Sequence, residues 1–217
     1  MPNLIIFDLD NTLLNGDSDR NWGIYLVEKN IVDDSYLKRS EKFYDNYYSG
    51  SLDIYGFLDF CVEPLKNNSM ELLLKTRKDF IEEKIKPIVL EKGENAVLNE
   101  LNNNNRVVIA TATNSFITKP IADLFGVKDL IATEFEIINN KFTGKVLGVP
   151  CFQEGKVQRV IEWIDANNFN LSSTTFYSDS FNDLPLLKKV DKAIVVDGDS
   201  KLIKEANNNG WDCISFR

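Results

Sequence analysis

Short apolar runs alternate with amphipathic segments along most of the chain, and this alternation restricts the fold more than any other feature. The runs cover residues 4–7, 106–110, 130–133, 174–177, 193–196 and 213–216. A continuous apolar run of this length is typical of a strand buried on both faces of a parallel sheet. Strands that alternate with helices predict a doubly wound, Rossmann-like α/β sheet flanked by helices, which binds ligands at the carboxyl ends of its strands.

The segments between the later runs have helical or hairpin patterns. One apolar face with the spacing i, i+3, i+4, i+7 is formed by Val157, Val160, Ile161 and Ile164. Residues 91–101 indicate another helix, and residues 135–146 predict a β-hairpin with two asparagines at its centre.

One interval breaks the alternation. Between residues 16 and 86 we find no convincing strand pattern, and amphipathic stretches cover residues 22–29, 37–48, 54–62 and 72–85. Gly50, Pro64 and Pro87 are expected to separate these helices. We predict an all-helical domain of residues 16–86, inserted after the first strand into an α/β core made of residues 1–15 and 87–217.

The composition excludes several classes of partner and catalyst. The chain has 25 Lys plus Arg against 33 Asp plus Glu and a formal net charge of -8, which argues against a nucleic-acid binder. No segment approaches the roughly 20 apolar residues of a membrane helix, and no signal peptide is found, so we expect a cytoplasmic protein. With no histidine, the chain has no Ser-His-Asp triad and no imidazole general base. Three separated cysteines give neither a disulfide framework nor a zinc knuckle.

Two acidic clusters each follow an apolar run directly. Asp8 and Asp10 leave the first predicted strand two residues apart, so both carboxylates are expected on the same side. Like charges so close are tolerable if a divalent cation or a cationic side chain neutralises them, and hard oxygen ligands at a strand end suit Mg²⁺. Asp179 follows the run 174–177 in the same way, with Asn182 and Asp183 in the first turn of the next helix. Turn formation and helix capping are the alternative explanations, although capping does not account for Asp179.

Two polar elements lie between these clusters in the chain. Thr113, with Thr111 as a rival, follows the strand that ends near residue 110, and Asn114 opens a polar loop before a helix, where backbone N–H groups can receive an anion. Lys156 begins the helix that contains Val157, and we place it on the polar side of that helix. Taken alone, a lysine in this position is more often a solvated surface charge.

In chain order, these elements resemble the haloacid dehalogenase superfamily of phosphatases. The four matching elements are Asp8-Leu9-Asp10-Asn11-Thr12-Leu13-Leu14, Thr113, Lys156 and Ser178-Asp179-Ser180-Phe181-Asn182-Asp183. The resemblance spans nearly the whole chain, because the helical insertion lies where the subfamily of phosphoserine phosphatases and histidinol-phosphatase-like hydrolases carries its cap domain.

The resemblance implies a role for each matching residue. Asp8 is expected to attack phosphorus and form an aspartyl-phosphate, and Asp10 to act as general acid and base. Mg²⁺ is expected on the Asp8 carboxylate, the Asp10 backbone carbonyl and Asp179. Thr113, Asn114 and Lys156 are expected to bind the phosphate oxygens. Asp183 is expected to orient Lys156 or a metal-bound water, and Asn182 is expected in the same supporting position.

The predicted cap domain decides the substrate hypothesis. In phosphoserine phosphatases an acidic residue near the position of Asp17 meets the substrate amine, and a cap arginine meets its carboxylate. Here residues 51–62 contain no Lys or Arg but include two aspartates and a cysteine, Asp53, Asp59 and Cys61. We therefore predict a small phosphorylated amino-alcohol such as histidinol phosphate, with phosphoserine second.

Several alternatives accompany this hypothesis. Asp17 and Arg20 are candidate substrate contacts, and a capped, solvated start of a helix that includes Asp19 is the alternative. Arg39 or Arg77 is a candidate to replace the cap arginine that would meet a substrate carboxylate. The cap aromatics are expected to form cap core more often than a pocket, and they are Phe43, Tyr44, Tyr47, Tyr48, Phe57 and Phe60. Phosphotransfer to an alcohol and a non-catalytic phosphate-accepting signalling module remain the alternative functions.

Overall fold

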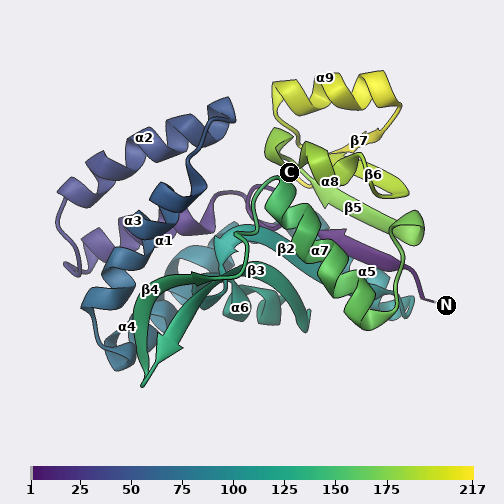
Figure 1. Cartoon of the computed structure of the whole chain (residues 1–217). Helices are drawn as coiled ribbons and strands as arrows, with labels where there is room; N and C mark the ends of the chain where they lie inside the picture. Colours follow the sequence, from purple (N-terminus) through teal and green to yellow (C-terminus); the bar gives the residue numbers. More distant parts are fainter. Residues whose placement is uncertain (1) are drawn as a thin grey trace.

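A seven-stranded sheet forms the centre of the molecule, for which a computed structural model describes residues 2–217 (Figure 1). The strands are β1 (Leu4–Phe7), β2 (Arg106–Asn114), β3 (Asp129–Ile138), β4 (Lys141–Leu147), β5 (Thr174–Ser178), β6 (Lys192–Val196) and β7 (Asp212–Ile214). Their order in the sheet is β4-β3-β2-β1-β5-β6-β7, and every pair is parallel except β3 with β4. The structure confirms the predicted doubly wound α/β fold.

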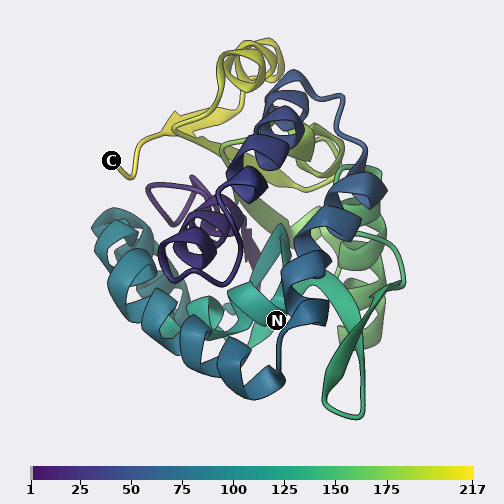
Figure 2. The ribbon, with the colours of Figure 1, turned by 90° about the vertical axis from the view of Figure 1, so that its left-hand side faces the viewer.

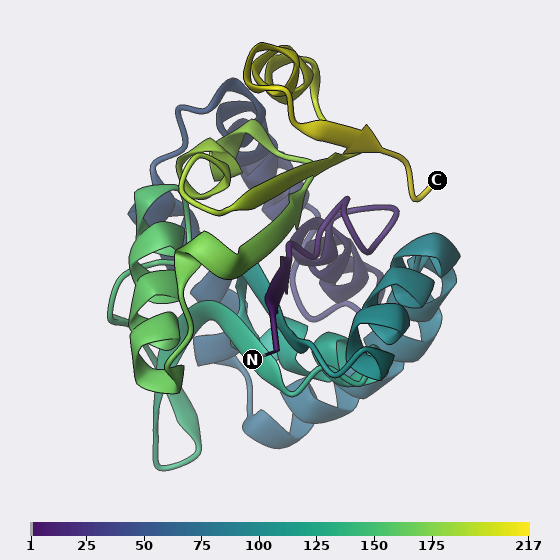
Figure 3. The same ribbon diagram turned by 90° about the vertical axis from the view of Figure 1, so that its right-hand side faces the viewer.

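Helices cover both faces of the sheet. The core helices are α5 (Glu91–Asn102), α6 (Ser115–Leu124), α7 (Glu154–Asn167), α8 (Leu184–Leu187) and α9 (Ser200–Asn209). Successive side chains of a strand point to opposite faces, so Ile5 and Phe7 pack in the cluster that includes α5 and α6, while Leu4 and Ile6 pack with α7, α8 and α9. Figure 3 shows α7 in green on one side of the sheet and α5 in teal on the other.

Four helices occupy the interval between β1 and α5 and face the viewer in Figure 2. They are α1 (Ser18–Glu28), α2 (Ser35–Ser49), α3 (Ile54–Asn67) and α4 (Met70–Phe80), followed by a π-helical turn (Ile81–Ile85) and a 3-10 turn (Lys86–Ile88). An isolated β-bridge between Leu14 and Val89 joins the two chain segments at the base of this interval. The domain division at residues 16 and 86 stays a prediction.

The helices of this interval pack in two groups. Residues of α1, α3 and α4 belong to the same hydrophobic cluster as the sheet. A smaller cluster joins α2 to α3, where the rings of Tyr36 and Phe60 stack 4.3 Å apart beside Cys61. Side-chain caps begin three of the four helices, on Asp17, Asp53 and Ser69, and each cap is worth about 1 kcal/mol.

The structure corrects two sequence-based boundaries. Pro64 does not end a helix but lies inside α3, which continues to Asn67 and thereby buries Leu65. The run 130–133 and the first arm of the predicted hairpin form one strand, β3, which pairs with β2 at its start and with β4 at its end. The hairpin itself is confirmed, with Asn139 and Asn140 at positive φ in its turn. No helix in the described part of the chain is long and apolar enough to cross a membrane.

Candidate active site

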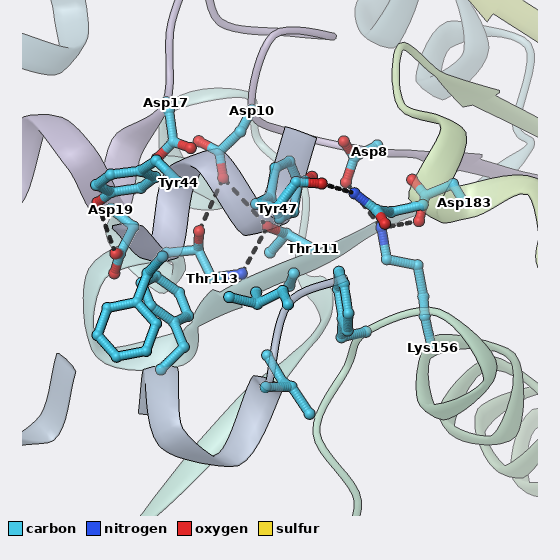
Figure 4. A pocket seen from close by; sticks show the side chains of 17 residues that line it. Asp8, Asp10, Asp17, Asp19, Tyr44, Tyr47, Thr111, Thr113, Lys156 and Asp183 are labelled. Carbon is cyan, nitrogen blue, oxygen red and sulfur yellow. Dashed lines mark hydrogen bonds and ion pairs between the residues drawn. The ribbon is translucent and has the colours of Figure 1, made fainter. Parts of the chain in front are cut away.

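Three neighbouring strands bring the predicted residues to one edge of the sheet. Phe7, the last residue of β1, pairs with Ile109 of β2 on one side and with Tyr177 of β5 on the other. The chain beyond Phe7 therefore carries Asp8 between the end of β2 and the end of β5. A pocket opens here between the sheet and the helices of residues 16–86, and Figure 4 shows the side chains that line it.

Lys156 contacts two carboxylates at the floor of the pocket. Its Nζ lies 3.0 Å from Asp8 Oδ1 and 2.6 Å from Asp183 Oδ1, and the lysine side chain is only 3% exposed. The hydroxyl of Ser178 donates to Asp183 Oδ2 at 2.7 Å and so fixes the orientation of that carboxylate. Asp183 thus contacts Lys156 directly, and its role in orienting the lysine stays a prediction.

The buried position of Lys156 corrects the expectation that it lies on the polar side of its helix. The residue before it, Gly155, allows the start of α7 to approach the preceding loop closely, because a Cβ there would lie 2.1 Å from the carbonyl oxygen of Pro150. Lys156 also precedes Val160 and Ile164 at the spacing i, i+4, i+8, so it lies on the buried face of α7 with them.

Burial dominates the electrostatics of this cluster. It raises the pKa of Asp8 to about 7; Lys156 opposes this shift, while Asp183 and Asp10 add to it. Burial alone would lower the pKa of Lys156, but the charges of Asp183 and Asp8 outweigh it and hold this pKa well above its ordinary value. Lys156 therefore stays cationic and offers a fixed positive charge beside Asp8.

Asp10 is surrounded by hydrogen-bond donors. Its Oδ1 accepts from the backbone N–H of Ser18 at 2.6 Å, and its Oδ2 accepts from the hydroxyls of Thr113 at 2.9 Å and Thr111 at 3.5 Å. Burial, with the charge of Asp17 added, raises the pKa of Asp10 to about 6 despite these donors. A carboxyl with a pKa near the working pH is suited to transfer protons.

The threonines and Asn114 differ in how they relate to the pocket. β2 extends to Asn114 instead of ending near residue 110, so Thr111 and Thr113 lie in the strand, and both line the pocket. Thr111 is fully buried and its hydroxyl also accepts from the N–H of Thr113 at 3.2 Å. Asn114 is absent from the described pocket wall, and its side chain caps α6 by accepting from Ile117 N–H. The phosphate contact predicted for Asn114 stays a prediction that this position does not favour.

Thr12 is a site residue that sequence reasoning left without a role. Its hydroxyl donates to Asp179 Oδ1 at 3.2 Å and accepts from the Asp179 backbone N–H at 3.0 Å, and so links the loops after β1 and β5. Burial, with the charges of Asp8 and Asp183 added, raises the pKa of Asp179 well above its ordinary value. The threonine of an Asp-x-Asp-x-Thr sequence was the signal for this contact.

The donor set of this corner fits a divalent cation that prefers oxygen. Lys156 pairs with Asp8 and Asp183, and Asp179 has no ion pair within residues 2–217, so one positive charge stands against three carboxylates. Within residues 2–217 no three His, Cys, Asp or Glu side chains converge as a metal-binding group. Carboxylate oxygens are the hard ligands that Mg²⁺ takes in proteins, usually together with water.

Asn182 joins the core to the helical insertion. It is buried; its Nδ2 donates to the backbone carbonyl of Tyr47 in α2 at 3.0 Å, and its Oδ1 accepts from Gln153 Nε2 at 2.9 Å. Lys201 binds the end of the same helix, with Nζ 3.1 Å from the carbonyl oxygen of Ser49. These contacts hold α2 over the pocket.

The acidic wall of the pocket comes from α1 and its cap. Asp17 and Asp19 line the pocket, whereas Asp53 and Asp59 are exposed on α3 or its cap and do not, which corrects the expectation that the latter make the pocket acidic. Asp17 lines the pocket and also caps α1, because its Oδ1 accepts from the N–H of Arg20 at 2.8 Å.

Three arginines considered as substrate contacts lie outside the described pocket wall. Arg20 is exposed, with its guanidinium 5.4 Å from the centre of the Tyr44 ring. Arg39 pairs with Glu63 at 3.0 Å, and Arg77 donates to the carbonyl of Phe116 at 2.6 Å. Lys156 is therefore the one cationic side chain among the described residues of the pocket wall.

The aromatic residues divide between pocket and cap core. Phe43, Tyr44, Tyr47 and Phe57 line the pocket. Phe60 packs in the cluster of α2 and α3, as expected of cap core, and Tyr48 is largely exposed.

These features define a doubly wound α/β protein with an acidic, partly aromatic pocket at the carboxyl end of its sheet. The sequence profile of the haloacid dehalogenase-like hydrolases matches residues 5–188, and the chain belongs to this family. It is a phosphatase, as the family and its relatives together establish.

Three similar proteins show how far the likeness extends. The chain is 39% identical over 222 residues to a histidinol-phosphatase of Neisseria meningitidis serogroup C (strain 8013), with both chains covered completely. A solved structure of a protein with unknown function from Bordetella pertussis Tohama I is 33% identical, with a TM-score of 0.93 and both chains covered completely. A substrate-bound phosphoserine phosphatase has a TM-score of 0.74 at 20% identity, with 99% of this chain and 93% of that chain covered, and shares the fold.

Proposed function

We propose that the protein hydrolyses the phosphomonoester of a small amino-alcohol, such as histidinol phosphate, through an aspartyl-phosphate on Asp8. One observation carries the proposal. The pocket places a buried Asp8–Lys156 pair, separated by 3.0 Å, beside a wall of further carboxylates and aromatic rings that has no second cation among its described residues. Such a site favours a substrate with a phosphate at one end and a positive charge beyond it.

The chemical steps assign one task to each catalytic carboxylate. An Asp8 oxygen attacks phosphorus, a P–O bond to Asp8 forms, and the P–O bond to the leaving alcohol breaks. Asp10, protonated at this stage, gives its proton to the departing oxygen. Water then attacks the phosphorus of the aspartyl-phosphate and passes a proton to Asp10, which releases inorganic phosphate and restores Asp8.

The positive and neutral donors of the site bind the phosphate oxygens. Lys156 lies closest to Asp8 and is held in place by Asp183, so its charge requires no rearrangement as negative charge develops. Thr111 and Thr113 lie at the same strand end, and their hydroxyls hold the Asp10 carboxylate. We keep Thr113 as the predicted phosphate contact, with Thr111 as its neighbour on the pocket wall.

A Mg²⁺ ion is part of the proposal. The residues that would hold it are Asp8, the backbone carbonyl of Asp10, and Asp179, and the ion would offset the repulsion between the carboxylates and a phosphate dianion. The support is the excess of buried carboxylates over cations in this corner.

The substrate class rests on charge. Phosphoserine carries a carboxylate that would enter a wall formed by Asp17 and Asp19 with no arginine or free lysine among its described residues. An amino-alcohol phosphate carries only the amine, which these carboxylates favour. The similarity to the histidinol-phosphatase of Neisseria meningitidis supports the same class.

Phosphate release from matched esters tests the substrate class. With Mg²⁺ present, we expect kcat/KM for histidinol phosphate to exceed that for phosphoserine by about tenfold or more, because the carboxylate of phosphoserine would be left without a partner. Addition of a chelator is expected to abolish both activities. Equal rates, or a preference for phosphoserine, would refute the amino-alcohol assignment.

Phosphotransfer is separated from hydrolysis in the same assay. Added acceptor alcohols, such as glycerol, are expected to leave the ratio of phosphate to released alcohol near one, because water is the proposed acceptor. A new phosphate ester of glycerol would identify a phosphotransferase instead. A signalling module would release about one phosphate for each protein molecule, and we expect many.

A further inference from the structure

One part of the pocket wall comes from the helical insertion. This part, which we call the ring pocket, is formed by Asp19, Phe43, Tyr44 and Phe57, whose side chains adjoin one another. Figure 4 shows Asp8, Asp10, Asp17 and Asp19 in this order from Lys156 toward Tyr44. A substrate with its phosphate at Asp8 and its leaving oxygen near Asp10 would therefore extend past Asp17 and end in the ring pocket.

Asp19 is fixed in the ring pocket by two donors from different helices. Its Oδ2 accepts from the hydroxyl of Tyr44 in α2 at 3.3 Å and from the thiol of Cys61 in α3 at 3.5 Å. Burial and the nearby Asp19 charge raise the pKa of Cys61 well above its ordinary value, so the thiol keeps its proton and remains a donor. The other carboxylate oxygen, Oδ1, receives none of the side-chain hydrogen bonds that the structure forms with Asp19.

Asp19 also forms no ion pair with any cationic side chain of residues 2–217. Asp19 is 9% exposed. Lys156, the lysine of the pocket wall, forms its ion pairs with Asp8 and Asp183. Arg20 is not part of the described pocket wall, and its guanidinium lies over the ring of Tyr44. Burial raises the pKa of Asp19 to about 6, with the charge of Asp10 adding to the shift, while Cys61 and Tyr44 oppose it. A buried carboxylate of this kind is stabilised when a ligand supplies a charged or N–H donor.

The walls of the ring pocket select the shape of that ligand. Phe43 and Phe57 lie with ring centres 5.5 Å apart, and Tyr44 lies 6.0 Å from Phe57 in an edge-on arrangement. Aromatic faces favour flat rings and cations. A saturated ammonium chain would satisfy Asp19 but leave these faces without a matching surface, whereas an N–H-bearing aromatic ring satisfies both.

We propose that Asp19 is a specificity-determining residue that accepts an N–H from an imidazole-type ring at the far end of the substrate, while Asp17 meets the amine. The inference rests on the proposed function and deepens it, because it assigns the two ends of the amino-alcohol to two different carboxylates. Tyr44 and Cys61 then act as the groups that hold Asp19 in position.

A pair of substrates that differ only in the ring tests the assignment. Histidinol phosphate and phenylalaninol phosphate share the phosphate, the amine and a flat ring, but only the first has a ring N–H. With the wild-type enzyme we expect kcat/KM for histidinol phosphate to be about 10- to 100-fold higher. In Asp19→Asn the neutral amide oxygen is a weaker acceptor than a carboxylate, so this ratio is expected to fall severalfold, mainly through a higher KM for histidinol phosphate, while kcat/KM for the phenyl compound is expected to change less.

Two controls separate recognition from folding. Asp53→Asn makes the same chemical change on an exposed cap of α3 outside the ring pocket, and should leave the ratio as in the wild type. Asp19→Asn removes a buried charge that has no cationic partner, so its ligand-free form is expected to melt at a temperature no lower than that of the wild type at pH 7.5. A lower melting temperature with equal losses on both substrates would assign Asp19 a purely structural role and overturn the inference.

The failure of the inference and that of the proposed function give different results. If the wild-type enzyme prefers histidinol phosphate over phosphoserine but does not distinguish it from phenylalaninol phosphate, the substrate class stands and the ring contact is wrong. The same holds if Asp19→Asn keeps the full selectivity of the wild type. A wild-type preference for phosphoserine overturns both.

Discussion

Asp8→Asn is expected to lower kcat by at least about 10⁴-fold, because a carboxamide oxygen is a poor nucleophile and cannot form the aspartyl-phosphate. The change keeps the size of a side chain that is 5% exposed, and it retains an oxygen that can accept from Lys156, now 3.0 Å from Asp8 Oδ1. Phosphate release from histidinol phosphate, followed to many turnovers for the wild type, measures the loss.

Two controls exclude deamidation of the asparagine back to aspartate, and misfolding, as explanations of the result. Asp8→Ala cannot revert by deamidation and is expected to show the same loss. The melting temperature of Asp8→Asn is expected to stay at or above that of the wild type, since burial raises the pKa of Asp8 and so penalises its charged form. Residual activity above about 1% of wild type, with the wild-type substrate preference, would contradict a nucleophilic role for Asp8.

Lys156→Met is expected to have the largest effect on stability. It leaves Asp8 and Asp183, now 3.0 and 2.6 Å from the lysine nitrogen, as buried carboxylates without a cation. Loss of one partner of a buried ion pair typically costs about 3–5 kcal/mol, and loss of the charge beside the reacting phosphate is expected to lower kcat by about 10³-fold. Denaturant unfolding and steady-state rates measure the two effects.

A surface ion pair of similar geometry provides the matched control. Lys84 Nζ lies 2.8 Å from Glu28, but the two side chains are 32% and 45% exposed, so Lys84→Met is expected to cost less than about 1 kcal/mol. If Lys156→Met fails to fold, the double variant Lys156→Met, Asp183→Asn should recover soluble protein because it removes one of the two buried charges. Equal unfolding midpoints for Lys156→Met and Lys84→Met would show that the buried pair does not hold the site together.

The destabilisation of Lys156→Met has a defined pH dependence. Burial raises the pKa of Asp8 to about 7 in the wild type, and removal of Lys156 takes away the main charge that lowers it. A carboxyl with a folded-state pKa above its unfolded value binds more protons when folded, so its penalty is greatest at high pH and disappears as the pH falls below the unfolded pKa. The cost of Lys156→Met is therefore expected to be smaller at pH 5 than at pH 8.

Strand ends were the part of the site that the sequence predicted well. Apolar runs that stop at Asp8 and Asp179 indicate buried parallel strands, and the carboxyl ends of neighbouring parallel strands meet at one edge. The apolar runs do not give the order of the strands in the sheet. However, Asp8 and Asp179 can take part in one reaction only if β1 and β5 lie close together. Their direct pairing explains why Thr12 reaches Asp179.

Features that depend on close packing between distant segments were not predictable in the same way. The spacing of Lys156 with Val160 and Ile164 places it on the buried face of α7, but contains no information on its partners, because the pairing with Asp8 depends on how α7 packs against the end of β1. The entry of Asp19 into the pocket, with Tyr44 and Cys61 as its donors, depends on how α1, α2 and α3 pack together. A capped helix start explained Asp19 equally well from sequence alone.

Chemical trapping of the covalent intermediate tests the central claim most directly. Enzyme mixed with histidinol phosphate and Mg²⁺ is quenched in acid during turnover, reduced with borohydride and digested, since an acyl phosphate is reduced to an alcohol where a free carboxylate is not. We predict homoserine at position 8, dependent on substrate and absent from Asp8→Asn. Homoserine at position 10 or 179, or no homoserine in an enzyme that releases phosphate rapidly, would contradict an aspartyl-phosphate on Asp8.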